Sequence, residues 1–135
     1  MEDPVFGPLA WHDGFLAWKG ELVWPGTDRV EVLLDEEDRA TGFLAARQSL
    51  AWVRDHEREV RQAVAAEFLD WCNDAFAPPV PISREEFLRG VELHQLRLDG
   101  DGGLWVLYSD MGLFGGHVFW AEYAADRRLL GFSAD

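Results

Sequence analysis

The middle of the chain carries the pattern of helices, whereas both ends carry the patterns of strands. Between Phe43 and Ala75, apolar residues recur at the three- and four-residue spacing that places them on one side of a helix. The charged stretch from Arg54 to Arg61 divides this pattern, so the sequence predicts two helices or one long bent helix. Helices that lie between two groups of strands are typical of the α+β class.

Seven segments have the alternation and composition of strands, and turn residues separate them. These segments are Phe6 to Trp11, Phe15 to Trp24, Arg29 to Leu34, Val91 to Leu98, Leu104 to Tyr108, His117 to Tyr123 and Leu129 to Phe132. The first three predict an N-terminal meander and the last four predict C-terminal hairpins. We therefore expect a mainly antiparallel sheet of about six to seven strands, with two to three helices packed on it.

Two of the predicted strands depart from simple alternation. In the strand from Val91 to Leu98 the apolar residues change sides near His94 and Gln95, which predicts a β-bulge. The strand from Leu104 to Tyr108 is apolar on both faces, and this is typical of a central strand that is covered on both sides. A hairpin connection over residues 99–103, rich in glycine and aspartate, joins the two.

Several short signals predict where the helices begin and end. The acidic run Asp35-Glu36-Glu37-Asp38 suits the positive end of a helix dipole, although it could instead be an acidic docking patch. The proline-rich stretch Ala77 to Pro81 ends the helical region. Ser83 and Glu86 have the spacing of a capping box, and Gly90 is expected to stop the helix that they begin.

Length and composition predict one domain that spans residues 1–135. The chain has 135 residues, of which 48% are hydrophobic, enough for a single core. Its only cysteine, Cys72, excludes an internal disulfide and a cysteine-based metal site within one chain. No apolar run is long enough for a membrane span, and the acidic start lacks the basic region of a signal peptide, so we expect a cytoplasmic location.

The charge balance limits the class of partner. The chain has 25 acidic and 12 basic residues, which give a net charge of −13. Such a charge repels phosphate backbones and anionic lipids, so binding to nucleic acid or to a membrane is not expected. It favours a basic protein as the partner, because complementary potentials accelerate association.

No catalytic or cofactor-binding motif is present. The chain lacks a Gly-x-Ser-x-Gly elbow, a Gly-x-Gly-x-x-Gly loop after a strand and a phosphate-binding Gly-x-x-x-x-Gly-Lys loop. The four histidines, His12, His56, His94 and His117, have no metal-ligand spacing. We therefore predict no cofactor, no metal and no catalytic residue, although acidic residues such as Asp110 and Glu122 could meet across strands.

The segment from Asp110 to Tyr123 is the strongest candidate for a binding site. Its glycine-rich turn ends at His117, whose imidazole could be oriented by Asp110 or could instead bond to a turn carbonyl. In the strand that follows, both faces carry aromatic residues, and tryptophan and tyrosine are enriched in interfaces. The candidate binding residues are Asp110, Phe114, His117, Phe119, Trp120 and Tyr123.

Short motifs along the whole chain resemble an uncharacterised bacterial group, the domain-of-unknown-function family numbered 2262, and similar small immunity-type proteins. The motifs are Phe6-Gly-Pro-Leu9, Trp18-x-Gly20, the mid-chain helices, Glu85-Glu86-Phe87 and Phe114-Gly-Gly-His117. The resemblance implies binding rather than catalysis, because the immunity-type proteins neutralise toxins by covering them.

Three functions are consistent with these observations. The first is a small acidic interaction protein that binds a basic protein, for example as an immunity protein. The second is a homo-oligomeric structural domain, such as a homodimer, in which exposed tryptophans meet. The third is a ligand-binding or enzymatic domain with a pocket near Asp110 and His117.

Overall fold

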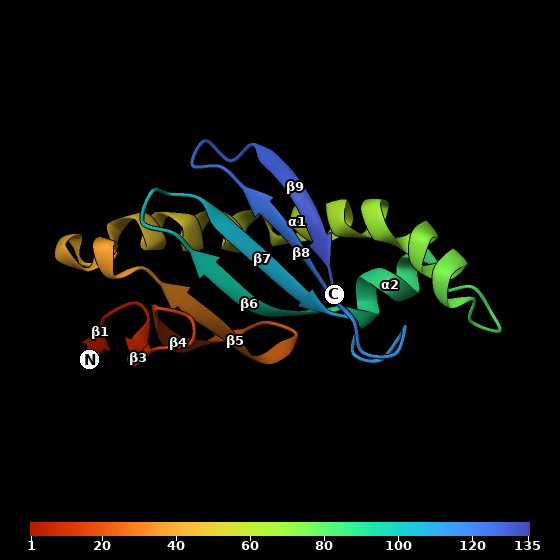
Figure 1. Ribbon diagram of the computed structural model, residues 1–135, viewed down its shortest axis with the longest axis horizontal. Helices are drawn as coiled ribbons and strands as arrows, with labels where there is room; N and C mark the ends of the chain where they lie inside the picture. Colours follow the sequence, from red (N-terminus) through yellow and green to blue (C-terminus); the bar gives the residue numbers. More distant parts are fainter.

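A computed structural model describes residues 1–135, and its centre is a seven-stranded sheet (Figure 1). The strands lie in chain order: β3 (Ala10–His12), β4 (Ala17–Trp24), β5 (Thr27–Leu34), β6 (Glu92–Leu98), β7 (Leu104–Ser109), β8 (Val118–Tyr123) and β9 (Leu129–Ala134). Only β5 and β6 are parallel, and every other neighbouring pair is antiparallel. The predicted α+β class and the mainly antiparallel sheet are confirmed.

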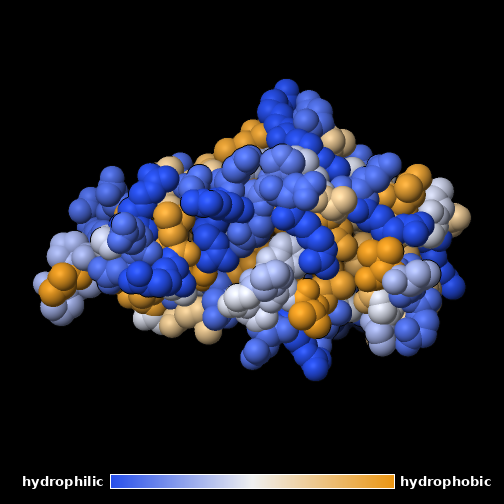
Figure 2. Space-filling view, turned by 180° about the vertical axis from the view of Figure 1, so that it is seen from behind, coloured by the Kyte–Doolittle hydropathy of each residue, from blue (hydrophilic) through white to orange (hydrophobic).

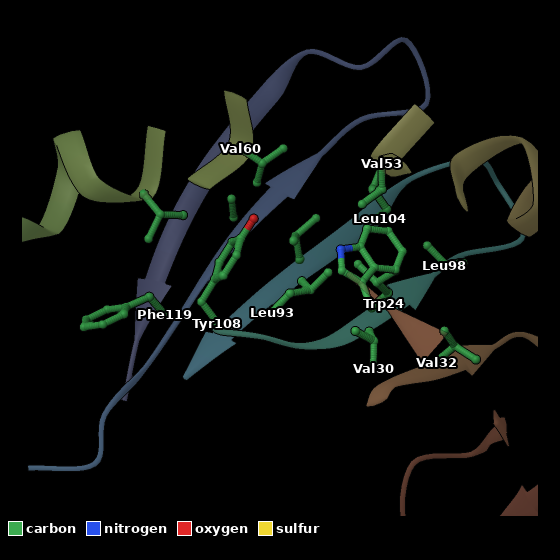
Figure 3. Close-up of a cluster of buried hydrophobic side chains, with 14 of the residues drawn as sticks. Trp24, Val30, Val32, Val53, Val60, Leu93, Leu98, Leu104, Tyr108 and Phe119 are labelled. Carbon is green, nitrogen blue, oxygen red and sulfur yellow. The ribbon is translucent and has the colours of Figure 1, made fainter. Parts of the chain in front are cut away.

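One long helix, α1 (Leu44–Phe76), connects the two parallel strands and runs across the back of the sheet (Figure 1). Its apolar side covers the inward side chains of the strands, most of which belong to one core of 28 buried residues. Figure 3 shows part of this core, where Val53 and Val60 of the helix face Leu93, Leu104 and Tyr108 of the sheet. The charged stretch from Arg54 to Arg61 is therefore part of one continuous helix and not a break: Val60 faces the sheet, and the exposed residues Arg54, Asp55, Arg58 and Glu59 face solvent.

The ends of the helices use side-chain caps. Asp38, in the 3-10 turn η1 (Glu36–Thr41), accepts hydrogen bonds from the backbone amides of Ala45 (3.2 Å) and Ala46 (2.9 Å). The acidic run thus begins the helix, as one of its two interpretations predicted. Ser83 caps α2 (Arg84–Gly90) by accepting from the amide of Glu86 at 3.1 Å.

Gly90 ends α2 for a different reason from the one predicted. It is not in the left-handed conformation. A Cβ atom at this position would lie 2.7 Å from Cδ1 of Leu113, so Gly90 allows the loop after β7 to pack directly on the helix.

The N-terminal segment was predicted incorrectly. Instead of one strand from Phe6 to Trp11, residues 2–8 form a small ribbon of β1 (Glu2–Asp3) and β2 (Gly7–Pro8). Asp3 turns the chain by accepting from the amides of Val5 and Phe6, and Pro8 cannot donate to a longer ladder. β4 also begins at Ala17 rather than at Phe15, because residues 13–16 form a turn in which Leu16 is left-handed.

The interior of the sheet confirms the predicted β-bulge and corrects the predicted burial of β7. The pairing of β6 with β7 shifts between Leu93 and Gln95, so that Leu93, Leu96 and Leu98 all face the helix. In β7, Leu104, Val106 and Tyr108 are buried, but Trp105 and Leu107 are only half-buried. β7 is central, yet one of its faces has no covering layer.

Candidate functional site

Asp110 has a structural role in the loop between β7 and β8. Its side chain is completely buried and accepts hydrogen bonds from the amides of Gly112 (2.8 Å) and Phe114 (3.1 Å). Its own amide donates to the carbonyl of His117 at 2.9 Å. The carboxylate therefore holds the glycine-rich loop and does not orient the imidazole, contrary to one of the sequence-based interpretations.

His117 and Phe114 belong to an aromatic contact at the end of α1. The half-buried ring of His117 stacks on Phe76, with 4.4 Å between ring centroids and 27° between planes. Phe114 is buried between Phe76 and Phe87. None of the five main hollows on the surface is lined by Asp110 or His117, so the structure gives no support to a pocket between them.

The remaining candidate residues lie on opposite faces of β8. Phe119 packs against Phe68 of α1 (4.9 Å), and Tyr123 packs against Trp52 (5.1 Å), so both are core residues. Trp120 points to the other side, where no helix lies. The six candidate residues therefore do not form one site, and Trp120 alone belongs to an exposed surface on the sheet.

That surface is the face of the sheet turned away from α1, and we call it the open face. It consists of two adjacent rows of cross-strand neighbours. One row contains Lys19, Leu33, Arg97, Trp105 and Glu122, of which Leu33 is buried, and the other contains Glu21, Glu31, Gln95, Leu107 and Trp120. Figure 1 looks onto this face, with α1 behind the strands. Figure 2 shows the opposite side, which is mainly hydrophilic with scattered apolar patches.

The centre of the open face is hollowed and apolar. A hollow of ≈ 490 Å³ is lined by Trp105, Leu107 and Trp120, together with the polar side chains of Gln95, Arg97 and Asp99. Trp120 is the cross-strand partner of Leu107, and Trp105 lies two residues before Leu107 on the same face of β7. Both indole rings are therefore neighbours of one aliphatic side chain. Aromatic rings with a polar rim are the usual composition of the centre of a protein interface.

The rim is fixed by polar contacts. Glu31 accepts from Nε2 of Gln95 (2.6 Å) and forms an ion pair with Nζ of Lys19 (3.1 Å). Nε of Arg97 lies 3.3 Å from Oδ1 of Asp99. Burial, and then the negative charge of Asp35, raise the pKa of Asp99. Glu122 has no ion-pair partner, which leaves a free negative charge beside Trp105.

Asp110 and Glu122, the two carboxylates that could have met across strands, do not come together. Glu122 lies on the open face, whereas Asp110 is buried in the loop beyond the other end of β7. No group of three or more His, Cys, Asp or Glu side chains is arranged to hold a metal ion. Cys72 is buried in the core, and this burial raises its pKa to about 11, so the side chain remains a thiol at neutral pH.

Sequence reasoning missed Trp105, Leu107, Gln95 and Arg97 as surface residues. The signal was present in β6, where Gln95 and Arg97 alternate with Leu96 and Leu98. Such alternation indicates that the face carrying Gln95 and Arg97 is exposed. Trp105 lies next to Arg97 in the sheet, so it shares that exposure.

Comparison with protein families matches residues 3–130 to a family described as an uncharacterised protein conserved in bacteria, DUF2262. The chain belongs to this family. The match runs from β1 into β9, so it covers almost the whole sheet and both α-helices. Comparison with curated proteins and with solved structures gave no significant match. None of the helices has both the length and the apolar character needed to cross a membrane.

Proposed function

We propose that this member of the DUF2262 family is an interaction domain that binds a basic protein through the open face. The observation that supports this most directly is the uncovered centre of the sheet, where Trp105, Leu107 and Trp120 line one hollow. Half-buried indoles of this kind are a common source of binding energy in interfaces. A partner that covered them would remove further apolar surface from water, which favours binding.

The charge of the molecule supports a basic partner. The net charge is −13, and on the open face Glu122 is free of ion pairs, whereas Lys19 and Arg97 are each paired with a carboxylate. The surplus charge near the hollow is therefore negative. An acidic potential accelerates the approach of a basic protein and selects against acidic ones.

The test is capture from a lysate with matched variants. The double variant Trp105→Thr/Trp120→Thr removes both indoles and keeps residues that favour strands. Trp71→Ala is the control, because Trp71 is 55% exposed on α1 and lies outside the open face. We expect one basic protein to be retained by the wild type and by the control, and lost with the double variant.

The affinity for the purified partner then decides the proposal. Loss of two interfacial tryptophans should weaken binding at least about 30-fold. The dissociation constant of the wild type should also rise with salt, because the charges attract less strongly in a screened solution. If the double variant binds as tightly as the wild type, the open face is not the interface.

We also propose that the protein has an immunity-type role and a cytoplasmic location. A basic toxin is the partner that an immunity-type role requires. Co-expression with the captured partner tests it: growth should be restored by the wild type and not by Trp105→Thr/Trp120→Thr. Separation of cytoplasmic from membrane and exported protein tests the location.

A homodimer through the same hydrophobic face is the competing proposal. It would cover the two tryptophans with a second copy of the chain. Light scattering over a range of concentrations separates the two proposals, because a dimer that is lost in Trp105→Thr/Trp120→Thr would assign the face to self-association.

A further inference from the structure

A second hollow, on the edge of the molecule between α1, the turn after β4 and the end of α2, gathers arginine side chains. It has a volume of ≈ 530 Å³ and is lined by Arg54, Arg58, Arg61 and Arg89. An adjoining hollow of ≈ 400 Å³ is lined by the last three of these residues. Four of the 12 basic residues in a chain with 25 acidic residues thus surround one place.

One of the four arginines, Arg61, has a structural role. Arg61 forms an ion pair with Glu57 at 2.7 Å and donates to the carbonyl of Leu88 at 2.9 Å and to that of Val91. Its guanidinium also lies over the ring of Tyr108. These contacts fix the junction of α2 and β6 on α1, and hence the position of Arg89 relative to α1.

The other three guanidinium groups have no carboxylate partner. No carboxylate oxygen lies within 4.0 Å of Arg54, Arg58 or Arg89. Arg54 lies over the ring of Trp24 at 4.7 Å, which holds it beside the hollow. Arg54 and Arg58 are one turn apart on α1, where two like charges destabilise a helix unless an anion lies between them.

The acidic residues around the hollows neutralise these arginines only in part. Asp55, Glu57 and Glu92 line the first hollow and Glu85 lines the second. Glu57 forms its ion pair with Arg61, and the side chain of Glu92 accepts a hydrogen bond from the hydroxyl of Thr27 at 3.4 Å. Arg29, Arg39 and Arg97 elsewhere in the molecule each form a direct ion pair, whereas in this hollow only Arg61 does so.

We propose that this arginine hollow binds the phosphate group of a small phosphorylated compound. Three guanidinium groups that line one hollow match a phosphate group, with its three acceptor oxygens, better than a carboxylate group, which has two. The four arginines of the hollow outnumber the three carboxylates that also line it, and acidic residues beyond about 8 Å act less because they are screened at physiological salt. The site is separate from the open face, which is formed by other residues.

Calorimetric titration at constant ionic strength tests this proposal. The probes are inorganic phosphate, pyrophosphate, a sugar phosphate and a nucleoside triphosphate, with succinate as the carboxylate probe. The variant is Arg58→Gln/Arg89→Gln, and the control is Arg84→Gln, an exposed arginine of α2 that lines neither hollow. Both variants should melt at the temperature of the wild type without ligand, because the replaced side chains are exposed.

We expect saturable binding of at least one phosphate compound, weakened at least about 10-fold in Arg58→Gln/Arg89→Gln and unchanged in Arg84→Gln. The ligand should raise the melting temperature of the wild type, and the double variant should lose this rise. The order of affinities among the four phosphate probes then identifies whether phosphate alone or a larger compound is bound. Absence of saturable binding, equal binding by the double variant, or tighter binding of succinate would overturn the proposal.

Discussion

The sequence around Asp110 allowed two roles for its carboxylate. Asp110 lies seven positions before a histidine, which suggested orientation of an imidazole, and two positions before a glycine, which is the spacing of a turn. In the structure the turn amides of Gly112 and Phe114 occupy its carboxylate oxygens. The two amides form these bonds because they belong to the same short loop as Asp110, so no other part of the fold is needed to place them.

Removal of this carboxylate should destabilise the protein. Asp110→Ala leaves the amides of Gly112 and Phe114 without acceptors in a buried setting, and we expect the free energy of unfolding to fall by about 1–3 kcal/mol. Urea denaturation measures it. Asp126→Ala removes an exposed carboxylate that accepts from the amide of Arg128, and it should cost less than about 0.5 kcal/mol. Equal losses in the two variants would contradict the structural role of Asp110.

Among the elements, the contact between the N-terminal ribbon and β4 depends on one glycine. A Cβ atom on Gly20 would lie 2.7 Å from Cδ2 of Leu9, 3.3 Å from the carbonyl oxygen of Pro8 and 3.4 Å from that of Phe6. The glycine allows the ribbon to lie directly on β4, where Phe6 and Leu9 enter the core. Gly20 is therefore a packing residue of the sheet and not a turn residue.

Gly20→Ala should separate this close contact. Because backbone atoms as well as a side chain block the added methyl group, we expect a loss of about 1–3 kcal/mol in the free energy of unfolding. Gly131→Ala is the matched control, since Gly131 also lies in a strand and a Cβ atom there would meet nothing within 4 Å. Thermal or urea unfolding of the two variants checks the difference, and a Gly20→Ala variant as stable as the wild type would show that the ribbon shifts freely.

Elements whose signals are local were predictable from the sequence, and those that depend on distant contacts were not. The cap at Ser83, the hairpin connection at 99–103 and the bulge at Gln95 need only neighbouring residues or one adjacent strand. The break between β2 and β3 was missed because the ribbon is held by contacts with β4. The unity of α1 was left open because a helix with a charged outer face carries the same local pattern as two helices with a charged connection.

At the scale of the whole molecule, partial burial of a carboxylate in a chain of net charge −13 lowers stability at Asp99. Burial, and then Asp35, raise the pKa of Asp99 above its usual value of 3.8. A carboxyl whose pKa is raised by folding binds its proton more tightly in the folded state, so its contribution to stability is full below pH 3.8 and is lost as the pH rises through the folded pKa. At neutral pH the ionised Asp99 therefore opposes folding.

Asp99→Asn should remove this cost. We expect the variant to be more stable than the wild type at pH 7 by up to about 1 kcal/mol, and the difference should disappear as the pH falls below 3.8. Urea denaturation across this pH range measures it. Asp126→Asn changes the net charge equally at an exposed position that does not contribute to the raised pKa of Asp99, so it controls for the general reduction of repulsion. A stabilisation that persists at low pH would show that the charge of Asp99 is not its cause.

The candidate site was the least predictable feature, because exposure of a sheet face is decided by the number of layers in the molecule. Trp105 and Leu107 have the composition of a buried strand, and a second helix would have made them core residues. The helical region in the middle of the chain forms one long helix, α1, and α1 covers only one face of the sheet. Sequence reasoning placed Trp120 in an interface, but it joined this residue to Phe119 and Tyr123, which the helix covers.

The single parallel pair, β5 with β6, joins two parts of the sheet that are far apart in the sequence. Strands β3 to β5 and strands β6 to β9 each follow one another through short connections, whereas β5 and β6 meet only after the segment 35–91 has crossed the back of the sheet. The pairing of β5 with β6 is therefore a long-range contact, and closing the loop formed by residues 35–91 costs more chain entropy than forming either group of antiparallel strands. An insertion or a circular permutation within the connection between β5 and β6 would leave both groups of antiparallel strands intact.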